Sequence, residues 1–131
     1  MIEIEVIGPE RAVPRGLTPD GVETLCTLAL ASAGVEDGHL AIEFVGEQRI
    51  RELNRDHRGL EEATDVLSFP VDEDGPATGP RELGDVVICP EHTEDLLVAV
   101  VHGMLHLTGM DHETDDGEML ALQAEIVSWL K

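Results

Sequence analysis

Residues 102–112 read HGMLHLTGMDH and place three histidines, His102, His106 and His112, at relative positions 0, +4 and +10. Side chains four residues apart lie on one face of a helix, so His102 and His106 can converge on one metal ion. Gly109 has the backbone freedom that lets the chain leave the helix and bring His112 to the same point. The spacing therefore predicts a zinc site with three protein ligands and an open fourth position, which is typical of catalytic zinc.

The apolar residues before and between the first two histidines predict that this helix is buried and central. We expect it to run from about residue 94 to 108, with Thr93-Glu94-Asp95 as its cap. The apolar run within it is interrupted by two histidines and is too short to span a bilayer. A buried central helix that carries metal ligands is the expected core element.

Hydrophobic periodicity predicts the other elements. Alternating patterns indicate strands at residues 2–7, 40–45, 66–71 and 83–89, the last two as a hairpin. Helical patterns indicate one helix from Thr18 to Gly34, a short one at 47–56, and a last one that buries Met119, Leu122, Ile126 and Trp129. These elements predict an α+β fold, a small mixed four-stranded sheet with helices packed around the central metal-bearing helix.

Composition predicts one cytoplasmic domain. The 131 residues, of which 42% are hydrophobic, can bury a core without help from a metal, so we expect a single domain over residues 1–131. The N-terminus lacks the basic and then apolar order of a signal peptide, which predicts a cytoplasmic protein. Cys26 and Cys89 are too few for a disulfide framework and too far apart for a metal knuckle, so we expect buried apolar side chains.

The charge is strongly negative, with 28 acidic residues against 8 basic ones and a formal net charge of −20. Such a surface repels nucleic acid at low salt, and it also suits a protein that stays soluble in a salty cytoplasm. Half of the basic residues lie within ten positions, at Arg49, Arg51, Arg55 and Arg58. These arginines form either a solvated helix face paired with Glu47 and Glu52 or a positive strip for a charged partner.

The histidine spacing resembles the HExxHxxGxxH pattern of the metzincin proteases. Those enzymes need a glutamate after the first histidine as general base, and this chain has Gly103 at that position. A metzincin-like metallohydrolase acting on peptides is therefore an alternative identity for this protein. Its usual mechanism would lack the general base, however.

Three motifs resemble the YbeY family, the metal-dependent single-strand-specific endoribonucleases of bacterial ribosomal RNA maturation and ribosome quality control. Residues 102–112 are similar to the signature HGxLHLxGxDH of that family. Residues 54–59 (NRDHRG), followed by 63–70 (ATDVLSFP), resemble its second motif, and residues 83–89 (LGDVVIC) resemble its GDIxI strand. The order of the elements also agrees, so the resemblance covers nearly the whole chain.

The resemblance implies a zinc-dependent endoribonuclease with one Zn²⁺ per chain, bound by His102, His106 and His112. It implies that Arg58 is catalytic and binds substrate, since a guanidinium can bind a phosphate with two hydrogen bonds and stabilise its developing charge. Arg55 is expected to contact the RNA backbone. The implied partners are single-stranded RNA, ribosomal RNA and the small ribosomal subunit, without a membrane.

Two parts of the mechanism stay open. The nucleophile is either an activated water or the 2′-hydroxyl of the RNA. Asp65, Asp85 and Asp111 are candidates for the proton acceptor or for orienting a metal-binding histidine, or they are ordinary cap and turn carboxylates. A non-enzymatic alternative is a ribosome-associated module in which zinc is structural.

Overall fold

The computed structural model describes residues 2–59, 64–70, 82–108 and 117–130. The strands are β1 (Ile2–Ile7), β2 (Gly38–Phe44), β3 (Val66–Pro70) and β4 (Glu82–Ile88). The α-helices are α1 (Pro19–Ser32), α2 (Glu47–Arg58), α3 (Leu96–Leu107) and α4 (Glu118–Leu130). Three short 3₁₀ helices complete the described elements: η1 (Pro9–Arg11), η2 (Val13–Arg15) and η3 (Pro90–His92).

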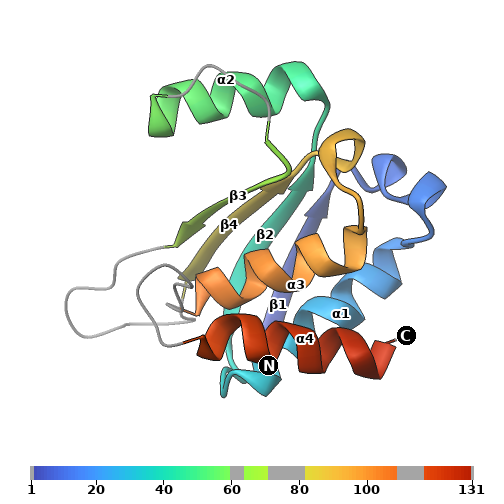
Figure 1. The fold of residues 1–131 in the computed structure, drawn as a ribbon, viewed down its shortest axis with the longest axis vertical. Helices are drawn as coiled ribbons and strands as arrows, with labels where there is room; N and C mark the ends of the chain where they lie inside the picture. The colour runs from blue at the N-terminus through green and yellow to red at the C-terminus, as the bar shows by residue number, and fades with distance from the viewer. Residues whose placement is uncertain (1, 60–63, 71–81, 109–116, 131) are drawn as a thin grey trace.

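The four strands form one mixed sheet in the order β1-β2-β4-β3 (Figure 1). β2 pairs in parallel with β1 and with β4, whereas β3 runs antiparallel to β4, with Val66 opposite Ile88 and Phe69 opposite Asp85. The prediction of an α+β fold with a small mixed four-stranded sheet is confirmed, and so is the hairpin pairing of the last two strands.

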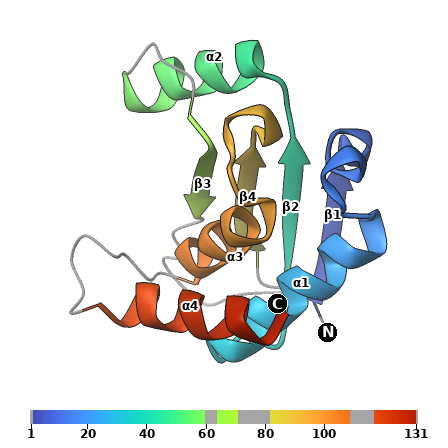
Figure 2. The same cartoon turned by 45° about the vertical axis from the view of Figure 1, so that its right-hand side comes forward.

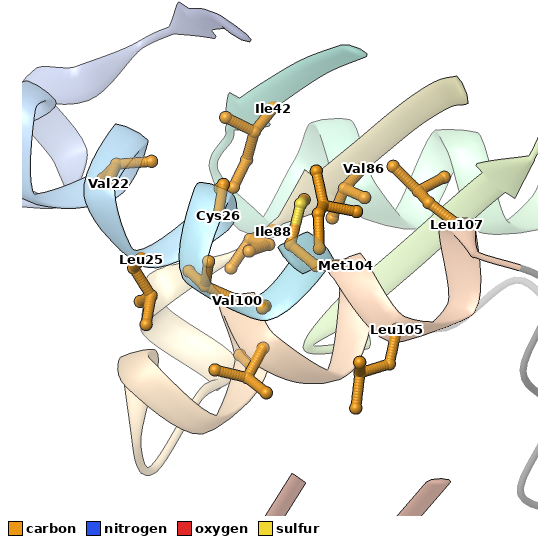
Figure 3. Packing of buried hydrophobic residues seen from close by; sticks show 14 of the residues in the cluster. Val22, Leu25, Cys26, Ile42, Val86, Ile88, Val100, Met104, Leu105 and Leu107 are labelled. Atoms are coloured by element: carbon orange, nitrogen blue, oxygen red, sulfur yellow. The ribbon is translucent and has the colours of Figure 1, made fainter. Parts of the chain in front are cut away.

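Helices α1 and α3 lie on one face of the sheet, α4 packs against these two helices, and together they form the main core with the sheet (Figures 1 and 2). Figure 3 shows side chains of α1 and α3 packed against β2 and β4, among them Cys26, Met104, Ile42 and Val86. The prediction that the histidine-bearing helix is central and buried is confirmed, since eight of the twelve residues of α3 are buried. Among the described residues, no helix is long and apolar enough to cross a membrane.

The other face of the sheet is only partly covered, by α2. This helix lies at the end of the sheet where β2 and β4 end (Figure 2). A smaller cluster joins it to the strands, and its buried members are Val45, Ile50, Leu67, Val87 and Cys89. The two faces of the sheet therefore differ, because one carries the main core and the other keeps exposed carboxylates such as Glu5 and Asp85.

The start of α3 is fixed by Asp95, the last of the three residues predicted as its cap. The Asp95 carboxylate accepts hydrogen bonds from the backbone N–H groups of Leu97 (3.1 Å) and Val98 (3.4 Å). Thr93 instead donates its hydroxyl to the Cys89 carbonyl at 2.7 Å. The helix therefore begins at Leu96, two residues later than predicted, because it is the Asp95 side chain that accepts from the first N–H groups of the helix, whereas the Thr93 hydroxyl is bonded to Cys89.

Arg15 of η2 holds the segment that leads into α3. Its guanidinium donates to the carbonyl of Pro90, to that of Thr93 at 2.6 Å and to that of Glu94 at 3.2 Å. A planar guanidinium with several fixed N–H donors can satisfy three carbonyls at once. The approach to the histidine-bearing helix is thus anchored from a distant part of the chain.

We expect Asp95→Ala to lower the free energy of unfolding by about 1 kcal/mol, because two N–H groups at the start of α3 lose their acceptor. Chemical denaturation followed by circular dichroism measures the change. Asp95→Asn is the matched control and should retain most of the stability, since its amide oxygen also caps a helix. Equal losses in both variants would contradict the capping role.

The prediction that Trp129 belongs to the core is wrong. Its side chain is 56% exposed, whereas Met119 and Ile126 of the same helix are fully buried. Trp129 lies in the last turn of α4, three residues beyond Ile126, the last buried residue of α4 in the described chain. The helical period gave the correct direction of the apolar stripe, but the core ends before the helix does.

Candidate functional site

His102 and His106 lie side by side on α3, both half-buried. Their Nε2 atoms are 3.1 Å apart, and their ring centroids are 4.7 Å apart at an interplanar angle of 75°. Two nitrogens that bind one tetrahedral zinc at about 2.0–2.1 Å are separated by about 3.3 Å. The two imidazoles thus already have the spacing of two ligands of one metal ion.

A third side chain, Gln123 of α4, contacts this pair. Its Oε1 lies 2.7 Å from Nδ1 of His102. An amide oxygen only accepts hydrogen bonds, so this contact favours the His102 tautomer with its hydrogen on Nδ1 and a lone pair on Nε2, the atom that faces His106. The arrangement fits a metal centre, because a ligating imidazole binds through one nitrogen and donates its other N–H to an acceptor.

Gln123 was not among the predicted site residues, although the sequence contains a signal for it. Met119, Leu122 and Ile126 define the inward stripe of α4, and residue 123 lies on the same stripe at helical spacing. A glutamine on an otherwise apolar stripe indicates a polar partner on the neighbouring element. Only the packing of α4 against α3 shows that this partner is His102.

The third predicted ligand, His112, lies outside the described residues, and so does Asp111. Within residues 2–59, 64–70, 82–108 and 117–130, no group of three or more His, Cys, Asp or Glu side chains is placed to hold a metal ion. The described structure therefore brings together two of the three predicted ligands. The complete three-histidine site remains a prediction.

The two cysteines are buried and free, as predicted. Burial raises the pKa of the Cys26 thiol to about 12, and burial also raises the pKa of the Cys89 thiol. Since the thiolate is the form that binds metal and reacts, neither side chain is suited to those roles. Both act as small apolar residues of the core.

Arg58 is the last residue of α2, which ends at Gly59 in the left-handed conformation (φ 72°). The side chain of Arg58 lies outside the described part of the structure. The C-terminal ends of α2 and α3 lie on the same side of the molecule, the side of the edge strand β3 (Figures 1 and 2). The two helices thus end toward the same side, although α2 lies at one end of the sheet and α3 lies across its face.

Two other arginines of α2, Arg49 and Arg55, have carboxylate neighbours. Arg55 Nε lies 3.3 Å from Asp56 Oδ1, and Arg49 Nη1 lies 3.8 Å from Glu52 Oε2. The predicted pairing of this helix face with Glu52 is therefore confirmed for Arg49. Exposed pairs of this kind contribute little free energy, so Arg55 can exchange its carboxylate for a phosphate at small cost.

Two of the candidate proton acceptors, Asp65 and Asp85, belong to the described residues. Asp65 accepts from the backbone N–H of Val66 at 2.9 Å, as an ordinary turn carboxylate does. Asp85 lies on the face of the sheet opposite α3, where it lines a cavity of about 380 Å³ with His57 and Phe69. The rings of these two residues are 4.7 Å apart. Asp85 therefore does not orient His102 or His106.

Gly103, between the two histidines, packs directly against side chains of the sheet. A Cβ atom at this position would lie 2.7 Å from Cγ1 of Val86 and 3.3 Å from Cγ2 of Val66. Real Cβ atoms essentially never come as close as the first distance. The position has no room for the glutamate of a metzincin, which argues against the peptide-cleaving alternative on steric as well as chemical grounds.

The fold and the histidine pair together define an α+β domain that carries a polar site on its buried central helix. A sequence profile of this class, described as endoribonuclease YbeY, matches residues 18–131. The chain belongs to the YbeY family.

Individual relatives agree with that assignment. The endoribonuclease YbeY of Geobacillus thermodenitrificans is 38% identical, over 86% of this chain and 88% of that protein. The endoribonuclease YbeY of Persephonella marina is 33% identical, over 89% of this chain and 84% of that protein. The solution structure of TM1509 from Thermotoga maritima matches with a TM-score of 0.59 at 29% identity, over 97% of this chain and 87% of that chain.

Proposed function

We propose that this protein is a zinc-dependent endoribonuclease that cleaves single-stranded RNA and acts in ribosomal RNA maturation and ribosome quality control. The observation that carries the proposal is the convergence of the His102 and His106 Nε2 atoms, 3.1 Å apart, on the central helix of a YbeY-family chain. Curated relatives of this chain are named endoribonucleases. The proposed partners are ribosomal RNA and the small ribosomal subunit.

His102 and His106 of α3, together with His112, would hold one zinc ion. When bound, zinc supplies a Lewis acid that polarises a phosphoryl oxygen or activates the nucleophile. Helix α3 gives this site a rigid support. α3 is capped by Asp95, buried along most of its length and packed tightly on the sheet at Gly103, so its two histidines are held in fixed positions.

The charge distribution indicates how RNA would approach. Helix α2 carries four arginines against three acidic residues, a formal charge of +1, whereas the rest of the chain carries −21. The exposed carboxylates of the open sheet face repel a phosphate backbone, and α2 is the helix on which the chain gathers its arginines. Arg55 and Arg58, toward the end of α2, would bind phosphates and place the scissile bond near the histidines.

The test of the proposal is cleavage of an end-labelled single-stranded ribosomal RNA fragment by the purified protein. We expect cleavage with zinc, none after chelation, and recovery when zinc is returned. The same fragment annealed to its complement should resist cleavage. Absence of zinc-dependent cleavage at every salt concentration would overturn the proposal, and cleavage of a labelled peptide in its place would support the metzincin-like alternative.

Arg58→Glu should reduce RNA cleavage at least about 100-fold, because it replaces a donor to the phosphate by a repelling charge. Arg51→Glu is the matched control, since Arg51 is an exposed residue two turns earlier on the same helix and the change in net charge is identical. Both variants should bind zinc as the wild-type protein does and should have the same free energy of unfolding. Equal cleavage by Arg58→Glu and Arg51→Glu would remove Arg58 from the mechanism.

A further inference from the structure

The contact between His102 and Gln123 joins the two helices that close the candidate site. His102 belongs to α3 and Gln123 to α4, and the hydrogen bond between Nδ1 and Oε1 measures 2.7 Å. Both side chains are half-buried, so the bond is shielded from competing water. A short, shielded hydrogen bond of this kind fixes the orientation of an imidazole ring.

The chemistry of the two atoms also fixes where the hydrogen lies. Gln123 Oε1 has lone pairs and no hydrogen, so Nδ1 of His102 is the donor. The other ring nitrogen, Nε2, is then unprotonated in the neutral ring and points at Nε2 of His106. In the alternative tautomer the hydrogen would lie on Nε2. It would then block the ring nitrogen that is placed to bind the metal.

We infer that Gln123 is a positioning residue of the metal site, which holds His102 in the Nδ1–H tautomer with its Nε2 lone pair toward the metal. This inference rests on the proposed zinc site. Gln123 touches neither substrate nor metal in this role and acts only through His102. The role requires an acceptor at residue 123 but not specifically an amide, so a carboxylate of the same length should serve.

The tautomer is measurable without any variant and without metal. Long-range ¹H–¹⁵N correlation spectra of the chelated, ¹⁵N-histidine-labelled protein distinguish a protonated from an unprotonated ring nitrogen. We expect His102 to be protonated on Nδ1 in the wild-type protein and in Gln123→Glu, and to shift toward the Nε2–H form in Gln123→Met. A wild-type His102 protonated on Nε2 would overturn the inference.

Zinc affinity, measured by competition with a chromophoric chelator, tests the consequence. Gln123→Met, which keeps the side-chain length but has no strong acceptor, should bind zinc about 10–100-fold more weakly, the usual effect of losing such a partner. Gln123→Glu should bind within a few-fold of the wild-type protein. The matched control is Gln48→Met, the same exchange at an exposed residue of α2, which should bind as the wild-type protein does.

Two failures can be told apart. If the wild-type protein binds zinc and Gln123→Met binds it equally tightly, the positioning role is wrong while the zinc site stands. If the wild-type protein binds no zinc, the proposed function fails, and the positioning role fails with it.

Discussion

His106→Ala is expected to lose stoichiometric zinc and, with it, RNA cleavage. A structural zinc site with four protein ligands contributes about 10–16 kcal/mol of binding free energy, so one protein ligand accounts for about 2.5–4 kcal/mol, or about 100- to 1,000-fold in affinity. The 3.1 Å between the two Nε2 atoms makes His106 half of the described ligand pair. Elemental analysis after gel filtration, and chelator competition, measure the loss.

The matched control is His39→Ala, which removes an imidazole that lies on β2 and contacts Glu82 at 3.0 Å. This variant should retain one zinc per chain and wild-type cleavage. The fold of His106→Ala should persist, because the side chain is half-buried and the core packs from other residues of α3. One tightly bound zinc in a folded His106→Ala protein would show that the site assignment is wrong.

Much of the fold was predictable because hydrophobic periodicity is a local property of the sequence. The strand predicted at 83–89 is observed at Glu82–Ile88, and the helix predicted at 94–108 is observed at Leu96–Leu107. The predictions are wrong where the burial of a residue depends on neighbours that are distant in sequence. Trp129 continues the apolar period of α4, yet it is exposed, because periodicity gives a direction around the helix and not the length of the core beside it.

The candidate site likewise has features that the sequence predicts and features that only the structure shows. The spacing of His102 and His106 is a property of one helix, so their convergence followed from the sequence alone. Gln123 is 21 residues from His102, and their contact depends on how α4 packs against α3. Strand alternation separates Asp85 from Val86, but only the structure shows that α3 covers the side of Val86.

Gly103→Glu, which would restore the metzincin signature, is expected to unfold the protein rather than to create a peptidase. The new Cβ would meet Cγ1 of Val86 at 2.7 Å, and overpacking of this kind costs about 1–3 kcal/mol. The buried carboxylate adds a further cost of several kcal/mol unless it is paired. A total of about 4 kcal/mol or more approaches the lower end of the stability of ordinary domains, which is about 5–15 kcal/mol.

Urea denaturation of Gly103→Ala, with and without Val86→Ala, isolates the steric part of this argument. Alanine gains about 1 kcal/mol over glycine in a helix, so Gly103→Ala alone should lose about 1 kcal/mol after overpacking is included. Val86→Ala removes Cγ1, the atom at 2.7 Å, and in that background Gly103→Ala should become neutral or stabilising. Additive effects of the two substitutions would contradict close packing as the reason for Gly103. A folded Gly103→Glu protein that hydrolyses peptides would return the metzincin alternative to first place, because the glycine is what separates this histidine helix from a protease helix.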